Sequence, residues 1–114
     1  MKNVLPVAAV CEALTGLALL VSPPIVVRLL FGADLTGVAI PVARVTGIAL
    51  IALGVACWPG PPRVGMLTYS AVVTLYLAYL GLAGGWSGIL LWPAVIVHLV
   101  LTAVLGLSAA EKGP

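Results

Sequence analysis

The chain has 114 residues, of which 63% are hydrophobic and 7% are charged, and its mean hydropathy is +1.30. This composition excludes a soluble globular domain, in which about 25% of residues are usually charged. The net charge is only +2, and no cluster of basic residues marks a nucleic-acid-binding surface.

Four apolar stretches have the length of a membrane span, about 20 residues. They cover residues 4–21, 37–58, 64–83 and 89–107. We expect helices, because an open sheet would leave backbone groups unpaired in lipid. A signal peptide is an alternative for the first stretch, since Lys2 precedes it, but Glu12 interrupts its apolar run. The prediction is an all-α protein, a single domain over residues 1–114 that forms a four-helix transmembrane bundle.

The basic residues outside the spans are distributed unevenly. Lys2, Arg63 and Lys112 fall on one side of the membrane, and Arg28 falls on the other. Because segments rich in lysine and arginine stay in the cytoplasm, we predict that both termini are cytoplasmic. The expected location is the inner (cytoplasmic) membrane, which the chain would cross several times.

The first span carries a glutamate on a face of small residues. Ala8, Glu12 and Gly16 repeat every four residues and therefore share one side of a helix. Small residues on both sides of a polar one indicate that a neighbouring helix approaches closely.

The segment at residues 24–32 is too short to cross the membrane and too apolar for a free loop. Pro24 can begin a helix there, Gly32 can end it, and Arg28 can reach lipid headgroups. We predict a short interfacial helix, followed by Asp34 ahead of the second span.

The second span contains an arginine in a run that has no other charge. A charge at the centre of a membrane helix costs from about 2.5 kcal/mol upward, so Arg44 should face protein and have a partner. Pro41, one turn earlier, should loosen the helix. Gly47 and Gly54 share the arginine face, which favours contact with another helix.

The third and fourth spans supply aromatic and titratable side chains. Tyr69, Tyr76 and Tyr79 share one face of the third span. We interpret Tyr69 as an interfacial anchor and Tyr76 as a deep residue. His98 lies in the middle of the fourth span, and Thr102 follows one turn later.

These polar residues lie at similar depths. With a rise of 1.5 Å per residue, Glu12 is roughly 12 Å and His98 about 14 Å from the cytoplasmic end of its span. Tyr76 is at about 18 Å and Arg44 at about 21 Å on the same scale. Each comes from a different span, so a compact bundle could bring all four side chains together around Arg44.

Two interpretations of this cluster remain open. Glu12 and Arg44 could form a buried structural ion pair, or Glu12 could carry a proton or act as a general base. His98 could be a packed, hydrogen-bonded histidine, or an acid/base group beside the carboxylate. A tyrosine face most often serves packing. No spacing of ligands predicts a metal site, and no motif predicts a cofactor.

Three short motifs carry a resemblance to a known family. They are Leu30-Phe31-Gly32 at the end of the segment 24–32, Arg44-Val45-Thr46-Gly47, and Trp92-Pro93-Ala94 followed by His98. Together they resemble the small bacterial four-helix membrane proteins called DoxX-like, and this resemblance implies a four-helix bundle. The chain is also similar to small multidrug resistance transporters in length, span number and a glutamate in the first helix. Arg44 has no counterpart in that pattern.

We therefore weigh three functions. The first is a midplane polar pocket that binds a small lipophilic molecule and could transform it by acid/base chemistry. The second is a non-catalytic accessory or scaffold subunit, and the third is a proton-coupled transporter that acts as a dimer. Each implies a homo-oligomer or a partner membrane subunit. For the pocket, the candidate catalytic residues are Glu12, His98 and Tyr76, and the candidate ligand-binding residues are Arg44, Tyr79 and Thr102.

Overall fold

The computed structural model describes residues 3–85 and 88–112. Over these residues the regular structure is helical, and no strand is present. The chain divides into two compact units at the Gly65–Met66 bond. We call residues 1–65 unit 1 and residues 66–114 unit 2, and each unit is described by itself.

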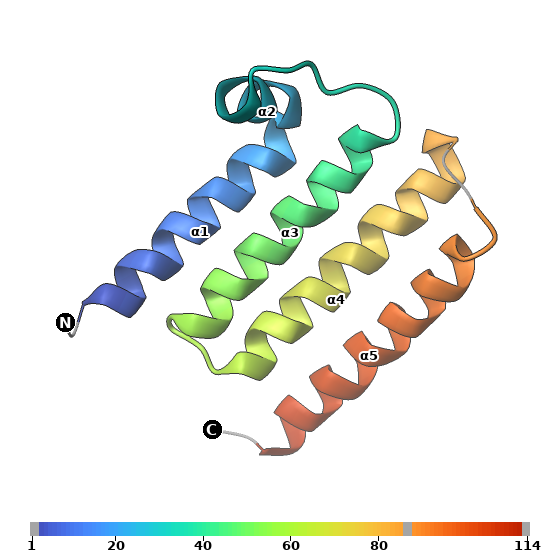
Figure 1. Ribbon diagram of the computed structural model, residues 1–114. Helices are drawn as coiled ribbons and strands as arrows, with labels where there is room; N and C mark the ends of the chain where they lie inside the picture. The colour runs from blue at the N-terminus through green and yellow to red at the C-terminus, as the bar shows by residue number, and fades with distance from the viewer. Residues whose placement is uncertain (1–2, 86–87, 113–114) are drawn as a thin grey trace. The chain divides into compact units, whose positions relative to one another are not determined.

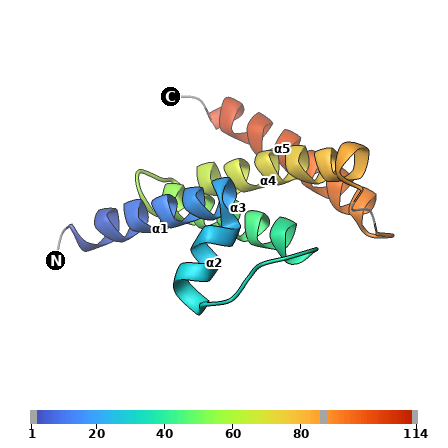
Figure 2. The ribbon, with the colours of Figure 1, turned by 90° about the horizontal axis from the view of Figure 1, so that it is seen from above.

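Unit 1 contains α1 (Val4–Val21), α2 (Pro23–Phe31) and α3 (Ala39–Cys57) (Figure 1). The first span and the short helix therefore form at the predicted positions. Ser22 lies between α1 and α2, and the prolines that follow it suit the first turn of a new helix. Figure 2 shows that α2 turns away from the direction of α1.

Two glycines set the ends of the segment between α2 and α3. Gly32 has a φ of 68° and ends α2 in the left-handed conformation, in which glycine has no steric penalty. Gly37 has a φ of 62°, and α3 begins two residues after it. The second span was predicted to start at Gly37, so its helix is shorter at this end than expected.

In unit 1, α1 and α3 pack side by side and antiparallel (Figure 1). A Cβ atom built on Gly16 would lie 2.4 Å from the carbonyl oxygen of Gly47, and one built on Gly47 would lie 2.5 Å from that of Gly16. Seven residues further along, a Cβ atom on Gly54 would lie 2.6 Å from the carbonyl oxygen of Ala9. The backbones therefore touch along a seam that only small residues permit. We call these four residues the glycine seam.

Unit 2 contains most of α4 (Pro62–Tyr79), a π-helical turn (Leu80–Gly84) that continues it, and α5 (Leu91–Lys112). The turn ends at Gly85, whose φ is 74°. A Cβ atom on Gly81 would lie 2.7 Å from the Trp92 ring, so α4 and α5 meet closely at this end (Figure 1). The third and fourth spans are confirmed as helices, although α5 extends beyond the predicted residue 107.

Four helices are long and apolar enough to cross a bilayer: Val4–Val21, Ala39–Cys57, Pro62–Ala83 and Leu91–Ser108. Between 6% and 28% of each span is buried within the protein. These helices suggest a multi-pass membrane protein.

Candidate functional site

Arg44 has a partner, but it is a backbone group. The Nε–H of Arg44 donates to the carbonyl oxygen of Leu20 at 3.3 Å, and the side chain is half-buried. Leu20 lies in the last turn of α1, where carbonyl groups have no partner inside the helix and a positive charge is favoured. Arg44 therefore stabilises the end of α1 and ties it to α3.

The predicted buried ion pair between Glu12 and Arg44 is not present in unit 1. Within the part of the chain that the structure describes, the ion pair present is the exposed one between Arg28 and Asp34. The glycine seam explains the separation. Gly16 lies against Gly47 and Ile51, so Glu12, one turn earlier in α1, is level with the next turn of α3, at least about 10 Å along the axis from Arg44.

Helical rotation separates the two side chains further. At about 100° per residue, Glu12 lies roughly 60° to one side of the seam on α1, and Arg44 lies roughly 60° from the seam on α3. Because the helices are antiparallel, these rotations carry the side chains to opposite flanks of the pair. Glu12 is half-buried and has no hydrogen-bond or ion-pair partner among residues 3–65.

In unit 2 the polar side chains of α5 bond to their own helix. His98 Nδ1 lies 2.7 Å from the carbonyl oxygen of Ala94, and the hydroxyl of Thr102 donates to the carbonyl oxygen of His98 at 2.7 Å. Since a carbonyl oxygen only accepts, Nδ1 carries the proton and Nε2 is the nitrogen left for other contacts. The Tyr69 ring lies edge-on to the imidazole at 5.9 Å between centroids.

Tyr69 is therefore the tyrosine beside His98 within unit 2. The interpretation of Tyr69 as an interfacial anchor stays a prediction, and the tyrosine expected near the histidine was Tyr76. Tyr76 lies two turns further along α4, about 10 Å away along the axis, and stacks on Tyr79 at 6.4 Å between ring centroids. The spacing of seven residues that puts Tyr69 and Tyr76 on one face also separates their depths.

Two buried hydroxyl groups in α4 have no hydrogen-bond partner in the described structure. They belong to Tyr76 and Ser70, and Ser70 is completely buried. The sequence analysis did not single out Ser70. The one feature of the sequence that could have marked Ser70 is Thr74, a second hydroxyl residue one helical turn later. In the structure the Thr74 hydroxyl donates to the Ser70 carbonyl oxygen at 2.6 Å. Unpaired hydroxyls of this kind are unfavourable in a dry interior, so they are further candidate binding groups.

Replacing Tyr69 by leucine is expected to shift the NMR resonances of the His98 imidazole and to lower stability by about 0.5–1.5 kcal/mol, because an edge-to-face ring contact is lost. His98 is the single histidine of the chain, so its resonances are easily assigned. Tyr76→Leu is the matched control and should leave the imidazole resonances unchanged. The reverse result, with Tyr76→Leu shifting them and Tyr69→Leu not, would show that the ring contact is misassigned.

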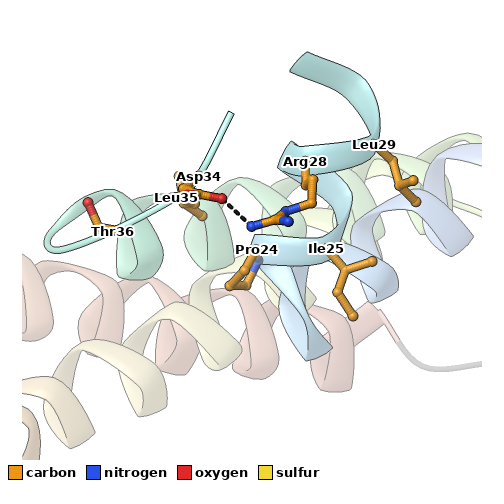
Figure 3. Close-up of a pocket in the computed structure, with 7 residues that line it drawn as sticks. All are labelled: Pro24, Ile25, Arg28, Leu29, Asp34, Leu35 and Thr36. Carbon is orange, nitrogen blue, oxygen red and sulfur yellow. Dashed lines mark hydrogen bonds and ion pairs between the residues drawn. The ribbon is translucent and has the colours of Figure 1, made fainter. Parts of the chain in front are cut away.

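A separate hollow lies in unit 1 beside α2 (Figure 3). It encloses about 580 Å³ and is open to the surroundings. Its lining consists of Pro24, Ile25, Arg28, Leu29, Asp34, Leu35 and Thr36. A side-chain nitrogen of Arg28 donates to the carboxylate of Asp34 at its edge. We call this hollow the α2 groove, and it was not predicted.

The candidate residues fall into two sets. Glu12 and Arg44 belong to unit 1, and Tyr76, Tyr79, His98 and Thr102 belong to unit 2. Comparison with protein-family models, with curated proteins and with solved structures finds no match. The resemblance to DoxX-like proteins and the gathering of all six residues around one pocket therefore stay predictions.

Proposed function

We propose that this chain is a multi-pass protein of a bacterial cytoplasmic membrane, with both termini in the cytoplasm and α2 in the opposite interface. The nine residues of α2 span only about 13 Å, which is less than half of a hydrocarbon core. Ile25, Leu29 and Phe31 expose at least 60% of their surface, as expected for a helix that lies in the headgroup region. The distribution of Lys2, Arg63 and Lys112 supports the orientation.

Within the membrane, the proposed activity is binding of a small lipophilic molecule at Glu12. The observation that carries it is the unpartnered, half-buried carboxyl group in the middle of α1. A carboxylate at this depth is stable only with a proton or a partner, and Arg44, which we had expected in that role, bonds to a backbone carbonyl instead. A lipophilic molecule with a cationic or hydrogen-bond-donating group would supply the missing partner.

Unit 2 carries candidate acid/base groups of its own. The Nε2 of His98 and the unpaired hydroxyl of Tyr76 are the groups that would exchange protons with a lipophilic molecule bound to that unit. Tyr79, which stacks on Tyr76, and Thr102, on the helix of His98, would complete its wall. Arg44 is assigned to holding α1 against α3, and any contact it makes with the ligand is secondary.

Binding of tetraphenylphosphonium, a lipophilic cation, tests the role of Glu12. The purified protein in detergent should bind it saturably in isothermal titration calorimetry, and Glu12→Gln should weaken binding by about tenfold or more, since the Coulomb attraction between the carboxylate and the cation is removed. Glu111→Gln removes an equal charge beyond the last span and should have no effect. Equal affinity of the wild type and Glu12→Gln would refute the proposed site.

A non-catalytic scaffold subunit is the second candidate. It is favoured by the hydrogen bonds of Arg44, His98 and Thr102, each of which is paired with a backbone carbonyl group of its own unit. In that case Glu12 contacts a polar group of another membrane helix. The calorimetric experiment separates the two candidates, because a scaffold binds no lipophilic cation at Glu12.

A further inference from the structure

The α2 groove combines one positive group, one negative group and an apolar wall. Arg28 and Asp34 stand side by side at its edge, with 70% and 71% of their side-chain surface exposed (Figure 3). Ile25 and Leu29 line it from the same helix and are 60% and 81% exposed. A ligand seated here would meet both charges at one end and hydrocarbon at the other.

The ion pair leaves much of its bonding capacity unused. It joins one guanidinium nitrogen, Nη2, to one carboxylate oxygen, Oδ1. Within the described ranges, Nη1 and Nε of Arg28 and Oδ2 of Asp34 have no partner. A guanidinium has five N–H donors and a carboxylate about four acceptor positions. The groove therefore offers donors for an anion directly beside acceptors for a cation.

We propose that the α2 groove binds the headgroup of a zwitterionic phospholipid that carries a primary ammonium group, such as phosphatidylethanolamine. The phosphate would accept from Arg28, and the ammonium would donate to Asp34. The headgroup dipole then lies antiparallel to the Arg28–Asp34 pair, and four charges alternate in sign around a closed ring. Both charges of the protein stay paired in this arrangement.

Other common headgroups satisfy the groove less well. An anionic glycerol headgroup brings a phosphate for Arg28 but nothing that neutralises Asp34. A choline headgroup brings a positive charge without N–H donors, so it cannot hydrogen-bond to the carboxylate. Thr36 also lines the groove, and its hydroxyl can donate a hydrogen bond to an ester or phosphate oxygen of the lipid. The acyl chains would continue along Ile25 and Leu29.

This inference rests on the proposed position of α2 in the membrane interface, and it is independent of the ligand proposed for Glu12. Such a lipid would tie α2 to the segment before α3, because Arg28 belongs to the helix and Asp34 to the segment that follows it. The headgroup would thus hold the entry to α3 at the membrane surface.

Native mass spectrometry of the full chain in detergent tests the site. The probes are phosphatidylethanolamine, phosphatidylglycerol and phosphatidylcholine with identical acyl chains. We expect phosphatidylethanolamine to bind roughly three- to tenfold more tightly than either of the others. Asp34→Asn should remove this preference. Arg28→Gln should lower the affinity for phosphatidylethanolamine by roughly three- to tenfold.

Arg63→Gln is the matched control, since it removes an arginine at the start of α4 and should leave lipid selectivity unchanged. Glu12→Gln should also keep the preference, so failure of the proposed Glu12 site and failure of the lipid site are distinguishable. Equal affinity for the three lipids, or a preference that survives Asp34→Asn, would overturn the inference. Circular dichroism of each variant would check that its helix content is unchanged.

Discussion

Gly47→Ala is expected to lower the free energy of unfolding by about 1–3 kcal/mol, and Gly47→Leu by more. A Cβ atom at Gly47 would lie 2.5 Å from the carbonyl oxygen of Gly16 and 2.9 Å from the amide nitrogen of Leu20. Both are backbone atoms, so no side-chain rotation can relieve the clash. The helices α1 and α3 would have to separate, which would also lengthen the bond from Arg44 to the end of α1.

Unfolding in mixed micelles titrated with SDS and followed by circular dichroism would measure this loss. Gly106→Ala is the matched control, because Gly106 also lies inside a helix and a Cβ atom there would meet nothing within 4 Å. That change should be neutral or stabilising by up to about 1 kcal/mol, as alanine is the better helix former. Equal effects of the two substitutions would show that the glycine seam does not hold α1 against α3.

Glu12→Gln and Arg44→Met are expected to change stability independently. Arg44→Met should cost about 1–3 kcal/mol, since the carbonyl of Leu20 loses its charged donor. Because Glu12 lies on the opposite flank and about 10 Å further along, the double variant should equal the sum of the single variants within about 0.5 kcal/mol.

A double-mutant cycle in the same micelles would measure the coupling. A buried ion pair behaves differently, because removing one partner leaves an uncompensated charge and removing both restores stability. A coupling of several kcal/mol would therefore contradict the register of the glycine seam and restore the ion pair predicted from the sequence. Arg63→Met combined with Glu12→Gln serves as an uncoupled reference pair.

The positions of the helices were largely predictable from the sequence. Hydropathy predicts the long apolar helices, and residues that stop helices predict their ends at Ser22, Gly32 and Trp58. Both properties depend only on residues close together in the sequence. The start of α3 was placed two residues too early, because Gly37 adopts a positive φ in the preceding segment rather than the first turn. Of the small residues on the predicted face of α1, Gly16 touches α3, whereas Ala8 is exposed and Ala9 makes the second contact.

The pairing of polar side chains was not predictable in the same way. Depth counted from the end of a span put Glu12, Arg44, Tyr76 and His98 near the midplane, although Glu12 and Arg44 differ by about 9 Å on that scale. Tyr76 lies about 10 Å along α4 from Tyr69, which contacts His98. Counting also ignores the rotation of each helix about its axis, which sends Glu12 and Arg44 to opposite flanks. The α2 groove was not predicted, because the chain must turn at Gly32 before Arg28 and Asp34 come into contact.

The sequence alone determined that the chain is helical, where its four long apolar helices lie and which few polar residues they carry, because these properties depend on neighbours along the chain. The tertiary structure decided the partners. It set Arg44 on the carbonyl of Leu20, placed Tyr69 beside His98 and left Glu12 unpaired within its unit. The physical reason is the close contact of glycine backbones, whose register fixes both the height and the rotation of each helix against its neighbour.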